Sequence, residues 1–285
     1  MSPTPNLKHE ATMFDARDGA RLFRQNWYPE GKPKAVMVIV HGLAEHSTRY
    51  RHVAEFLCAH DIAVETFDLR GHGQSEGKRI YINRFSNYLD DLDQFLLEVR
   101  QRFPSGPLFL FGHSMGGAIA TAFVLENQIK TLNGLLLSGA AVKVGEDISA
   151  FLQAMSSVIS AILPTISTIT LDSSAISRDP AVVSHYDQDP LNFRGPIPAR
   201  TGAELIKAQK QIQKHAGKLI IPTLIMHGTA DRLADPNGSR ILYEKALSSD
   251  KTLKLYDGFY HEILNDPEKQ RVLDDMLSWM ESHLT

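Results

Sequence analysis

A Gly-x-Ser-x-Gly segment lies between a predicted apolar strand and a predicted helix, and this arrangement restricts the folds that the sequence can adopt. Residues 107–111 form a short apolar run, typical of a strand buried on both faces, which leads directly into Gly112-His113-Ser114-Met115-Gly116. Residues 118–126 continue as a helical pattern. A serine on a sharp strand–turn–helix junction is typical of a nucleophile elbow, where glycines relieve clashes with neighbouring chain. The alternative interpretation is that Ser114 caps a helix whose glycines allow close packing.

Short apolar runs alternate with longer helical patterns, which predicts an α/β fold with a mostly parallel sheet and helices on both faces. We expect the other strands at residues 12–15, 21–27, 35–40, 63–67, 134–138, 219–226 and 252–256. We expect helices at residues 50–59, 83–103, 118–126, 239–247 and 267–283. The alternation stops between the strands predicted at 134–138 and 219–226. We therefore expect a core of residues 1–140 and 219–285, with a helical cap at 141–218 inserted over the carboxyl edge of the sheet.

Composition excludes several classes of function. The 285 residues are 43% hydrophobic and 22% charged, which is enough for a packed core. The net charge is −3 without a block of like charges, so we expect no nucleic-acid partner. Cys58 is the only cysteine, which excludes an internal disulfide and cysteine-rich metal sites. Residues 1–10 lack the apolar stretch of a signal peptide, and a reduced, cytoplasmic setting is the expectation.

A serine hydroxyl is a weak nucleophile and requires an adjacent base, which in turn needs an orienting acid. Asp231 follows one predicted strand and His261 follows the next, so both are expected at the same sheet edge as Ser114. The order serine, acid, histidine is that of the α/β-hydrolase fold. We therefore predict that Asp231 holds the tautomer of His261, and that His261 takes the proton of Ser114.

Other residues compete for these roles. Asp235 is the rival acid, although it also suits the cap of the helix predicted near Ser239. The other histidines near strand ends precede the acid in chain order, namely His41, His72, His113 and His227. For the oxyanion hole we predict two backbone N–H groups, those of Met115, after the nucleophile, and Leu43, in the loop after the strand at 35–40.

Several segments resemble the monoacylglycerol lipases, and the resemblance extends from about residue 10 to residue 283. Its most specific part is His41-Gly42-Leu43-Ala44-Glu45-His46-Ser47-Thr48-Arg49-Tyr50 combined with Ser177-Arg178-Asp179-Pro180. The other matching segments are 68–77, 112–117, 186–190, 227–233 and 260–261. The sequence looks closer to the bacterial members, because Glu262-Ile263-Leu264 lacks the extra histidine of the mammalian pattern and Ala234 stands where some members carry cysteine.

The resemblance implies a serine hydrolase that converts monoacylglycerols to fatty acid and glycerol through an acyl-enzyme on Ser114, with no metal or organic cofactor. It also implies that Glu45, Arg49 and Tyr186 line the polar end of the substrate pocket, where a polyol needs hydrogen-bond partners. For Glu45 and Arg49 a structural ion pair is an equal alternative. A broader carboxylesterase or lysophospholipase is the alternative function, and a non-catalytic hydrolase-fold binding protein is the alternative from another class.

Residues 148–171 contain no charged side chain, and their apolar residues recur at helical spacing. These are Phe151, Leu152, Met155, Val158, Ile159, Ile162, Leu163 and Ile166. Interspersed Ser, Thr, Gln153 and Pro164 argue against a membrane span. The stripe either packs within the cap or lines an acyl tunnel. We favour the tunnel, with at most peripheral and transient membrane contact through the cap, because an interfacial anchor usually carries Lys or Arg.

Overall fold

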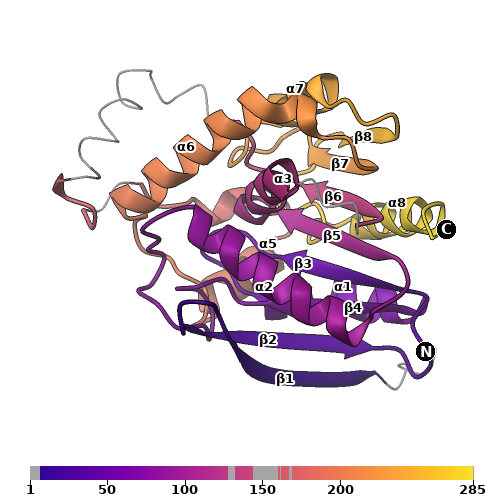
Figure 1. Cartoon of the computed structure of the whole chain (residues 1–285). Helices are drawn as coiled ribbons and strands as arrows, with labels where there is room; N and C mark the ends of the chain where they lie inside the picture. Colours follow the sequence, from indigo (N-terminus) through magenta and orange to yellow (C-terminus); the bar gives the residue numbers. More distant parts are fainter. Residues whose placement is uncertain (1–6, 128–131, 144–159, 161, 167–168, 285) are drawn as a thin grey trace.

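The computed structural model describes residues 7–127, 132–143, 160, 162–166 and 169–284. Its centre is an eight-stranded sheet of order β1-β2-β4-β3-β5-β6-β7-β8 (Figure 1). The strands β1 and β2 pair antiparallel, β2 is antiparallel to β4, and the pairs from β4 through β8 are parallel. Their bounds are β1 Lys8–Asp15, β2 Arg21–Tyr28, β3 Ala35–Val40, β4 Ile62–Phe67, β5 Leu108–His113, β6 Gly134–Ser138, β7 Thr223–Gly228 and β8 Lys251–Tyr256.

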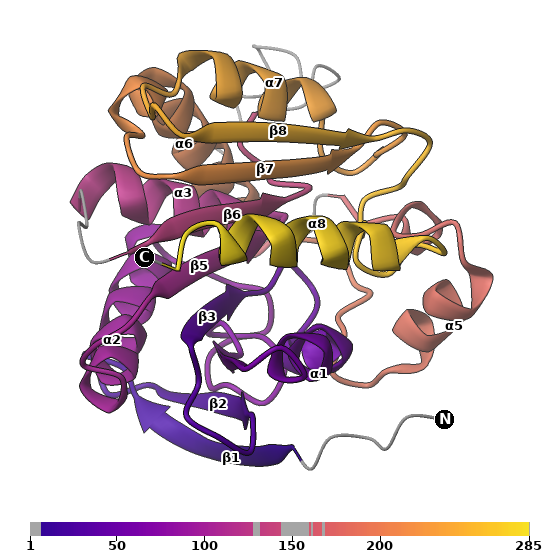
Figure 2. The same ribbon diagram turned by 90° about the vertical axis from the view of Figure 1, so that its right-hand side faces the viewer.

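Helices cover both faces of the sheet (Figure 2). On one face lie α2 (Ser86–Arg102), α3 (Met115–Asn127), α6 (Ala199–His215) and α7 (Pro236–Lys245), and on the other lie α1 (Arg51–Cys58) and α8 (Lys269–Glu281). Two clusters of buried apolar residues form the core, one on each face of the sheet. Within β3, Val38 and Val40 belong to the cluster under α2, α3, α6 and α7, while Met37 and Ile39 belong to the cluster under α1 and α8. Because alternate side chains enter two buried layers, the strand is apolar throughout. The predicted α/β class and mostly parallel sheet are confirmed.

Element bounds differ from prediction where one residue changes the backbone. The strand predicted from residue 219 begins at Thr223, because Pro222 has no N–H for the sheet ladder. The helix predicted from residue 239 begins earlier, at Pro236, with the Asp235 side chain accepting a hydrogen bond from the N–H of Asn237. An Asp followed by Pro is a helix start, so this bound was readable from the sequence.

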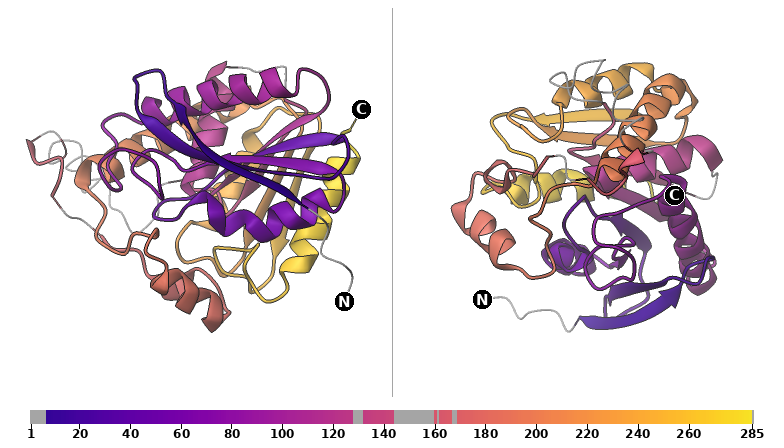
Figure 3. Two further views of the ribbon diagram at one scale, coloured as in Figure 1. Left: turned by 90° about the horizontal axis from the view of Figure 1, so that it is seen from below. Right: turned by 90° about the vertical axis from the view of Figure 1, so that its left-hand side faces the viewer.

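The chain between β6 and β7 contains η2 (Ser173–Ala175), α5 (Pro180–Gln188), α6 and η3 (Ala216–Lys218) among its described residues. Figure 3 shows the segment with α5 standing away from the sheet. By contrast α6 packs against α3, and its Ala208 and Ile212 belong to the same core cluster. This segment therefore has one part that projects and one part that is built into the core.

Within the described residues, no helix is both long and apolar enough to cross a membrane. Over the same residues, no three His, Cys, Asp or Glu side chains gather in a way that could hold a metal ion.

Candidate active site

Ser114 directly follows β5 and has a left-handed backbone, with φ of +53°. For a residue with a Cβ this conformation costs on the order of 1–3 kcal/mol and persists only where the surroundings impose it. Here the Ser114 N–H donates to the carbonyl of Ser138 at the end of β6, over 3.0 Å. Its carbonyl accepts from the N–H groups of Ala118 and Ala141, at 3.1 and 3.0 Å. A helix N-cap residue has extended backbone, so Ser114 does not have the conformation of a cap.

Gly112 and Gly116 permit this turn because other chain comes too close for a side chain. A Cβ on Gly112 would lie 2.5 Å from the carbonyl oxygen of Gly116, and a Cβ on Gly116 would lie 2.1 Å from that of Val40. Both distances are far inside van der Waals contact. The glycines therefore let β3, β5 and α3 meet at the serine.

Asp231 and His261 lie side by side in the loops after β7 and β8. His261 Nδ1 is 2.7 Å from Asp231 Oδ2, and both residues are buried. The N–H groups of Leu233 and Ala234 donate to the other oxygen, Asp231 Oδ1, at 2.8 and 2.9 Å. The structure thus brings together the two residues predicted as acid and base, at the carboxyl edge of the sheet where Ser114 also lies.

His227, which chain order argues against as the base, is a second histidine on the same carboxylate. Its Nε2 lies 2.9 Å from Asp231 Oδ2 and 3.2 Å from the Ala234 carbonyl, so this nitrogen must carry a proton. Its Nδ1 is 2.7 Å from Ser239 Oγ. The available signal was the spacing of His227 four residues before Asp231, at the end of a strand.

The rival acid Asp235 has other partners. Its carboxylate accepts from the N–H of Asn237 at the start of α7 and pairs with Lys143 Nζ at 2.7 Å. Because both contacts belong to the helix cap and a neighbouring loop, they give Asp235 a structural role that needs no catalysis.

The electrostatics keep Asp231 charged and make His261 a stronger proton acceptor. Burial alone would raise the pKa of Asp231, but the charge of His261 and hydrogen bonds from His227 and His261 hold it well below its usual range. Burial would lower the pKa of His261, yet Asp231, with Glu262 and Glu45, raises it above its ordinary value. Burial and the charge of His261 lower the pKa of His113 to about 4, so this neighbouring ring stays neutral.

The two predicted oxyanion-hole donors lie on elements that border Ser114. Met115 is the first residue of α3, so its N–H has no acceptor within the helix. The loop with Leu43 passes beside the serine, since a Cβ on Gly42 would lie 3.1 Å from Ser114 Cβ. The N–H of Gly42 itself donates to Glu45 Oε1 at 2.6 Å. That bond occupies one amide of the loop and favours Leu43 as the donor toward Ser114.

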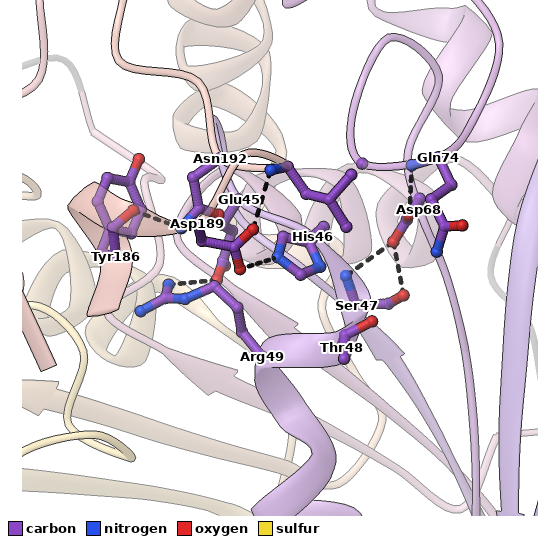
Figure 4. A network of polar contacts seen from close by, with 12 residues as sticks. Glu45, His46, Ser47, Thr48, Arg49, Asp68, Gln74, Tyr186, Asp189 and Asn192 are labelled. Carbon is purple, nitrogen blue, oxygen red and sulfur yellow. Dashed lines mark hydrogen bonds and ion pairs between the residues drawn. The ribbon is translucent and has the colours of Figure 1, made fainter. Parts of the chain in front are cut away.

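Glu45, Arg49 and Tyr186 are gathered at one place (Figure 4). Arg49 Nη1 donates to Glu45 Oε2 at 2.8 Å, and the guanidinium carbon lies 4.9 Å from the centre of the Tyr186 ring. The Tyr186 hydroxyl donates to the carbonyl of Ala44 at 3.1 Å. Burial alone would raise the pKa of Glu45, but Arg49 lowers it to about 2. The ion pair considered as the alternative for Glu45 and Arg49 is present.

Glu262, which stands out in the sequence only as a departure from the mammalian pattern, completes this group. Arg49 Nη1 and Nη2 donate to the two oxygens of Glu262 at 2.6 and 2.7 Å, a bidentate pair. Glu262 directly follows His261, while Arg49 lies in the short 3-10 helix η1 (Ser47–Tyr50) that precedes α1. No local pattern links residues 213 positions apart, so the contact could be found only in three dimensions.

Comparison with known proteins places this chain among serine hydrolases. The profile of the family described as serine aminopeptidase S33 matches residues 31–268. The monoacylglycerol lipase of Mycolicibacterium smegmatis is 38% identical over 95% of this chain and 96% of its own length. Human monoglyceride lipase is 38% identical over 86% of this chain and 80% of its own. The crystal structure of Paleococcus ferrophilus monoacylglycerol lipase superposes with a TM-score of 0.83 and 31% identity, covering 92% of this chain and 99% of that one.

Proposed function

The chain belongs to the monoacylglycerol lipase family of α/β-hydrolases, and from this premise we propose that it hydrolyses monoacylglycerols through an acyl-enzyme on Ser114. It is a carboxylic ester hydrolase, and its substrate is a lipid ester. The observation that carries the residue assignment is the left-handed Ser114 at the sheet edge where the buried Asp231–His261 pair also lies. A left-handed serine is strained, and such strain is typical of functional sites.

In the proposed mechanism His261 Nε2 takes the proton of the Ser114 hydroxyl while Oγ attacks the ester carbonyl. Asp231 accepts the Nδ1–H of His261 and so fixes the tautomer that leaves Nε2 free to act as base. The backbone N–H groups of Leu43 and Met115 stabilise the oxyanion, each contributing on the order of 10²–10³ in kcat. His261 then protonates the departing glycerol oxygen, and water repeats the sequence on the acyl-enzyme to release the fatty acid.

For the glycerol end we propose contacts with Arg49 and Tyr186. A guanidinium has five N–H donors, and the bonds to Glu45 and Glu262 engage three of them. The Tyr186 hydroxyl donates to Ala44 and can still accept a hydrogen bond from a glycerol hydroxyl. Glu45 accepts from the N–H of Gly42, the Tyr50 hydroxyl and Arg49, so its part in head-group binding is to orient Arg49.

Fatty-acid release by the purified protein from a panel of esters, with aniline release from an amino-acid anilide measured beside it, tests the substrate class. We expect the highest kcat/KM for monoacylglycerols, compared with di- and triacylglycerols, lysophosphatidylcholine and an amino-acid anilide. The reason is that a polar pocket end of a few hydrogen-bonding groups suits one small polyol and rejects a second acyl chain. Equal turnover of all esters would replace this proposal with a general carboxylesterase, and preference for the anilide would replace it with a peptidase.

We also propose that residues 141–218 act as a cap over the acyl chain, with α6 as the part fixed to the core, and that the cap contacts lipid surfaces transiently. Support comes from four exposed apolar side chains in its described part, Ile162, Leu163, Ile166 and Ile169. The larger part of the predicted apolar stripe, residues 151–159, lies outside the described residues.

The double substitution Ile162→Ser with Ile166→Ser should raise KM about three- to tenfold for a long-chain monoacylglycerol in vesicles, because less apolar area enters the interface. Kinetics on water-soluble p-nitrophenyl butyrate should stay unchanged. Leu247→Ser is the matched control, since Leu247 is 74% exposed and Ile162 73%, but Leu247 follows α7. If the cap variant and the control give the same KM on vesicles, the proposed lipid contact is wrong.

A further inference from the structure

A continuous chain of hydrogen bonds joins the loop after β3 to the loop that carries His261. It begins at the Gly42 N–H, which donates to Glu45 Oε1, and passes from Glu45 Oε2 to Arg49 Nη1 over 2.8 Å. Arg49 then donates to both oxygens of Glu262, at 2.6 and 2.7 Å. One end of this chain is next to the proposed oxyanion donor Leu43, and the other end is next to the proposed base.

The two carboxylates in this series of hydrogen bonds are buried, and their oxygens accept hydrogen bonds from further donors. Glu45 is 4% exposed and Glu262 5%. Glu45 Oε1 also accepts from the Tyr50 hydroxyl at 2.8 Å, and Glu262 Oε2 accepts from Asn265 Nδ2 at 2.9 Å. Desolvation cancels much of the attraction in buried ion pairs, so they add little stability, whereas their fixed geometry can orient neighbouring groups. The main effect expected of the ion pairs of Arg49 with Glu45 and Glu262 is therefore to orient the neighbouring groups.

The loop after β3, which these hydrogen bonds hold in place, is under backbone strain. Ala44 has φ of +67°, a left-handed conformation that a residue with a Cβ rarely adopts. Its carbonyl accepts from the Tyr186 hydroxyl and from the N–H of Phe193, at 3.1 and 3.0 Å. With Glu45 bonded to the Gly42 N–H on the other side, the turn is held from both directions. Loosening one support lets the strained turn relax and move Leu43.

We propose that Glu262 is a positioning residue for ester hydrolysis, which through Arg49 and Glu45 fixes the oxyanion-hole loop relative to His261 whatever alcohol leaves. The inference rests on the proposed function, because it needs Ser114 as the nucleophile. It goes beyond head-group binding, since a group that only recognises glycerol would not affect an ester that has none.

The carboxylates in this series of hydrogen bonds also act on the proposed base, His261. The His261 imidazole feels the charges of Asp231 after β7, of Glu262 and of Glu45, and its ring lies 4.7 Å from that of neutral His113 at the end of β5. Burial lowers the pKa of His261, and the carboxylates, Asp231 foremost, raise it. Removing the negative charge of Glu262 leaves Arg49 less compensated, so the pKa of His261 falls. Since the base must be neutral, the acid limb of kcat/KM then moves to lower pH.

The test is Glu262→Gln, assayed from pH 5 to 9 on a monoacylglycerol and on p-nitrophenyl butyrate, which has no glycerol. We expect kcat to fall on the order of 10–100-fold on both esters, as misplacement of about 1 Å does, with KM changed much less. The acid limb should shift downward. Arg49→Lys should lower kcat similarly with a smaller pH shift, because it keeps the charge but loses the bidentate geometry. Glu268→Gln is the control, because Glu268 is an exposed carboxylate in the same loop region after His261 and pairs with Arg178 instead of Arg49.

The outcomes separate cleanly. Unchanged kcat on p-nitrophenyl butyrate with a raised KM for the monoacylglycerol would overturn the proposal and leave a head-group subsite. A loss of kcat without any pH shift, matched by a lowered Tm, would overturn it in favour of a structural ion pair. If the Ser114→Ala variant keeps wild-type activity, the proposed function is overturned instead. That outcome does not depend on Glu262.

Discussion

Ser114→Ala should lower kcat on p-nitrophenyl butyrate by roughly 10⁶-fold, the scale seen when the nucleophile of a serine hydrolase is removed. Only the hydroxyl group is lost, and the oxyanion donors and the binding pocket remain. Residual activity should therefore still exceed the uncatalysed rate by roughly 10³–10⁴. Alanine inherits the left-handed backbone that serine already has, so the free energy of unfolding should change little.

Two measurements check this result, steady-state hydrolysis and covalent labelling by a fluorophosphonate, with circular dichroism to show that the variant is folded. The matched control is Ser174→Ala, an exposed serine in η2, which should keep wild-type turnover and labelling. Labelling that persists in Ser114→Ala would move the nucleophile elsewhere. Wild-type protein that neither labels nor turns over ester would favour the non-catalytic binding protein.

Asp231→Asn should lower kcat by about 10⁴-fold, which is the effect of the same change in another serine hydrolase triad. The reason lies in the donors around the carboxylate. Two N–H groups, of Leu233 and Ala234, point at Oδ1, so the amide oxygen of asparagine must take that place. Its NH₂ group then faces the protonated Nε2 of His227 and the Nδ1 of His261. Donor against donor at His227 is repulsive, and at His261 the amide selects the tautomer that cannot act as base.

Asp235→Asn provides a control in the same loop. This substitution keeps a side chain that can cap α7 and removes the charge paired with Lys143, so kcat should stay near the wild-type value. The two variants should be compared at equal fraction folded, by kcat on the soluble ester and by Tm. A loss in Asp235→Asn as large as that in Asp231→Asn would make Asp235 the orienting acid and contradict the assignment.

Much of the fold follows from local patterns. The runs at β3 and β5 are apolar at every position because they are buried on both faces, and that property is visible in the sequence without knowledge of the partners. The bounds were wrong where a single residue decides them, as at Pro222 and Asp235. The prediction of Ser114 as nucleophile is equally local, because the strand, the Gly-x-Ser-x-Gly segment and the helix are contiguous. Chain order then pointed to Asp231 and His261, whose catalytic roles remain predictions.

Local sequence is enough to predict the alternation of strands and helices, the elbow at Ser114 and the sheet edge where its partners lie, because each depends on neighbours along the chain. The contacts of those residues depend on segments that meet only in the folded protein. The second histidine on Asp231 depends on how one loop folds back on its strand. The bond from Arg49 to Glu262 joins segments 213 residues apart, which meet because β3, β5, β6, β7 and β8 pair in parallel and bring their carboxyl ends together. Such pairing is set by the packing of the whole sheet, and no short stretch of sequence records it.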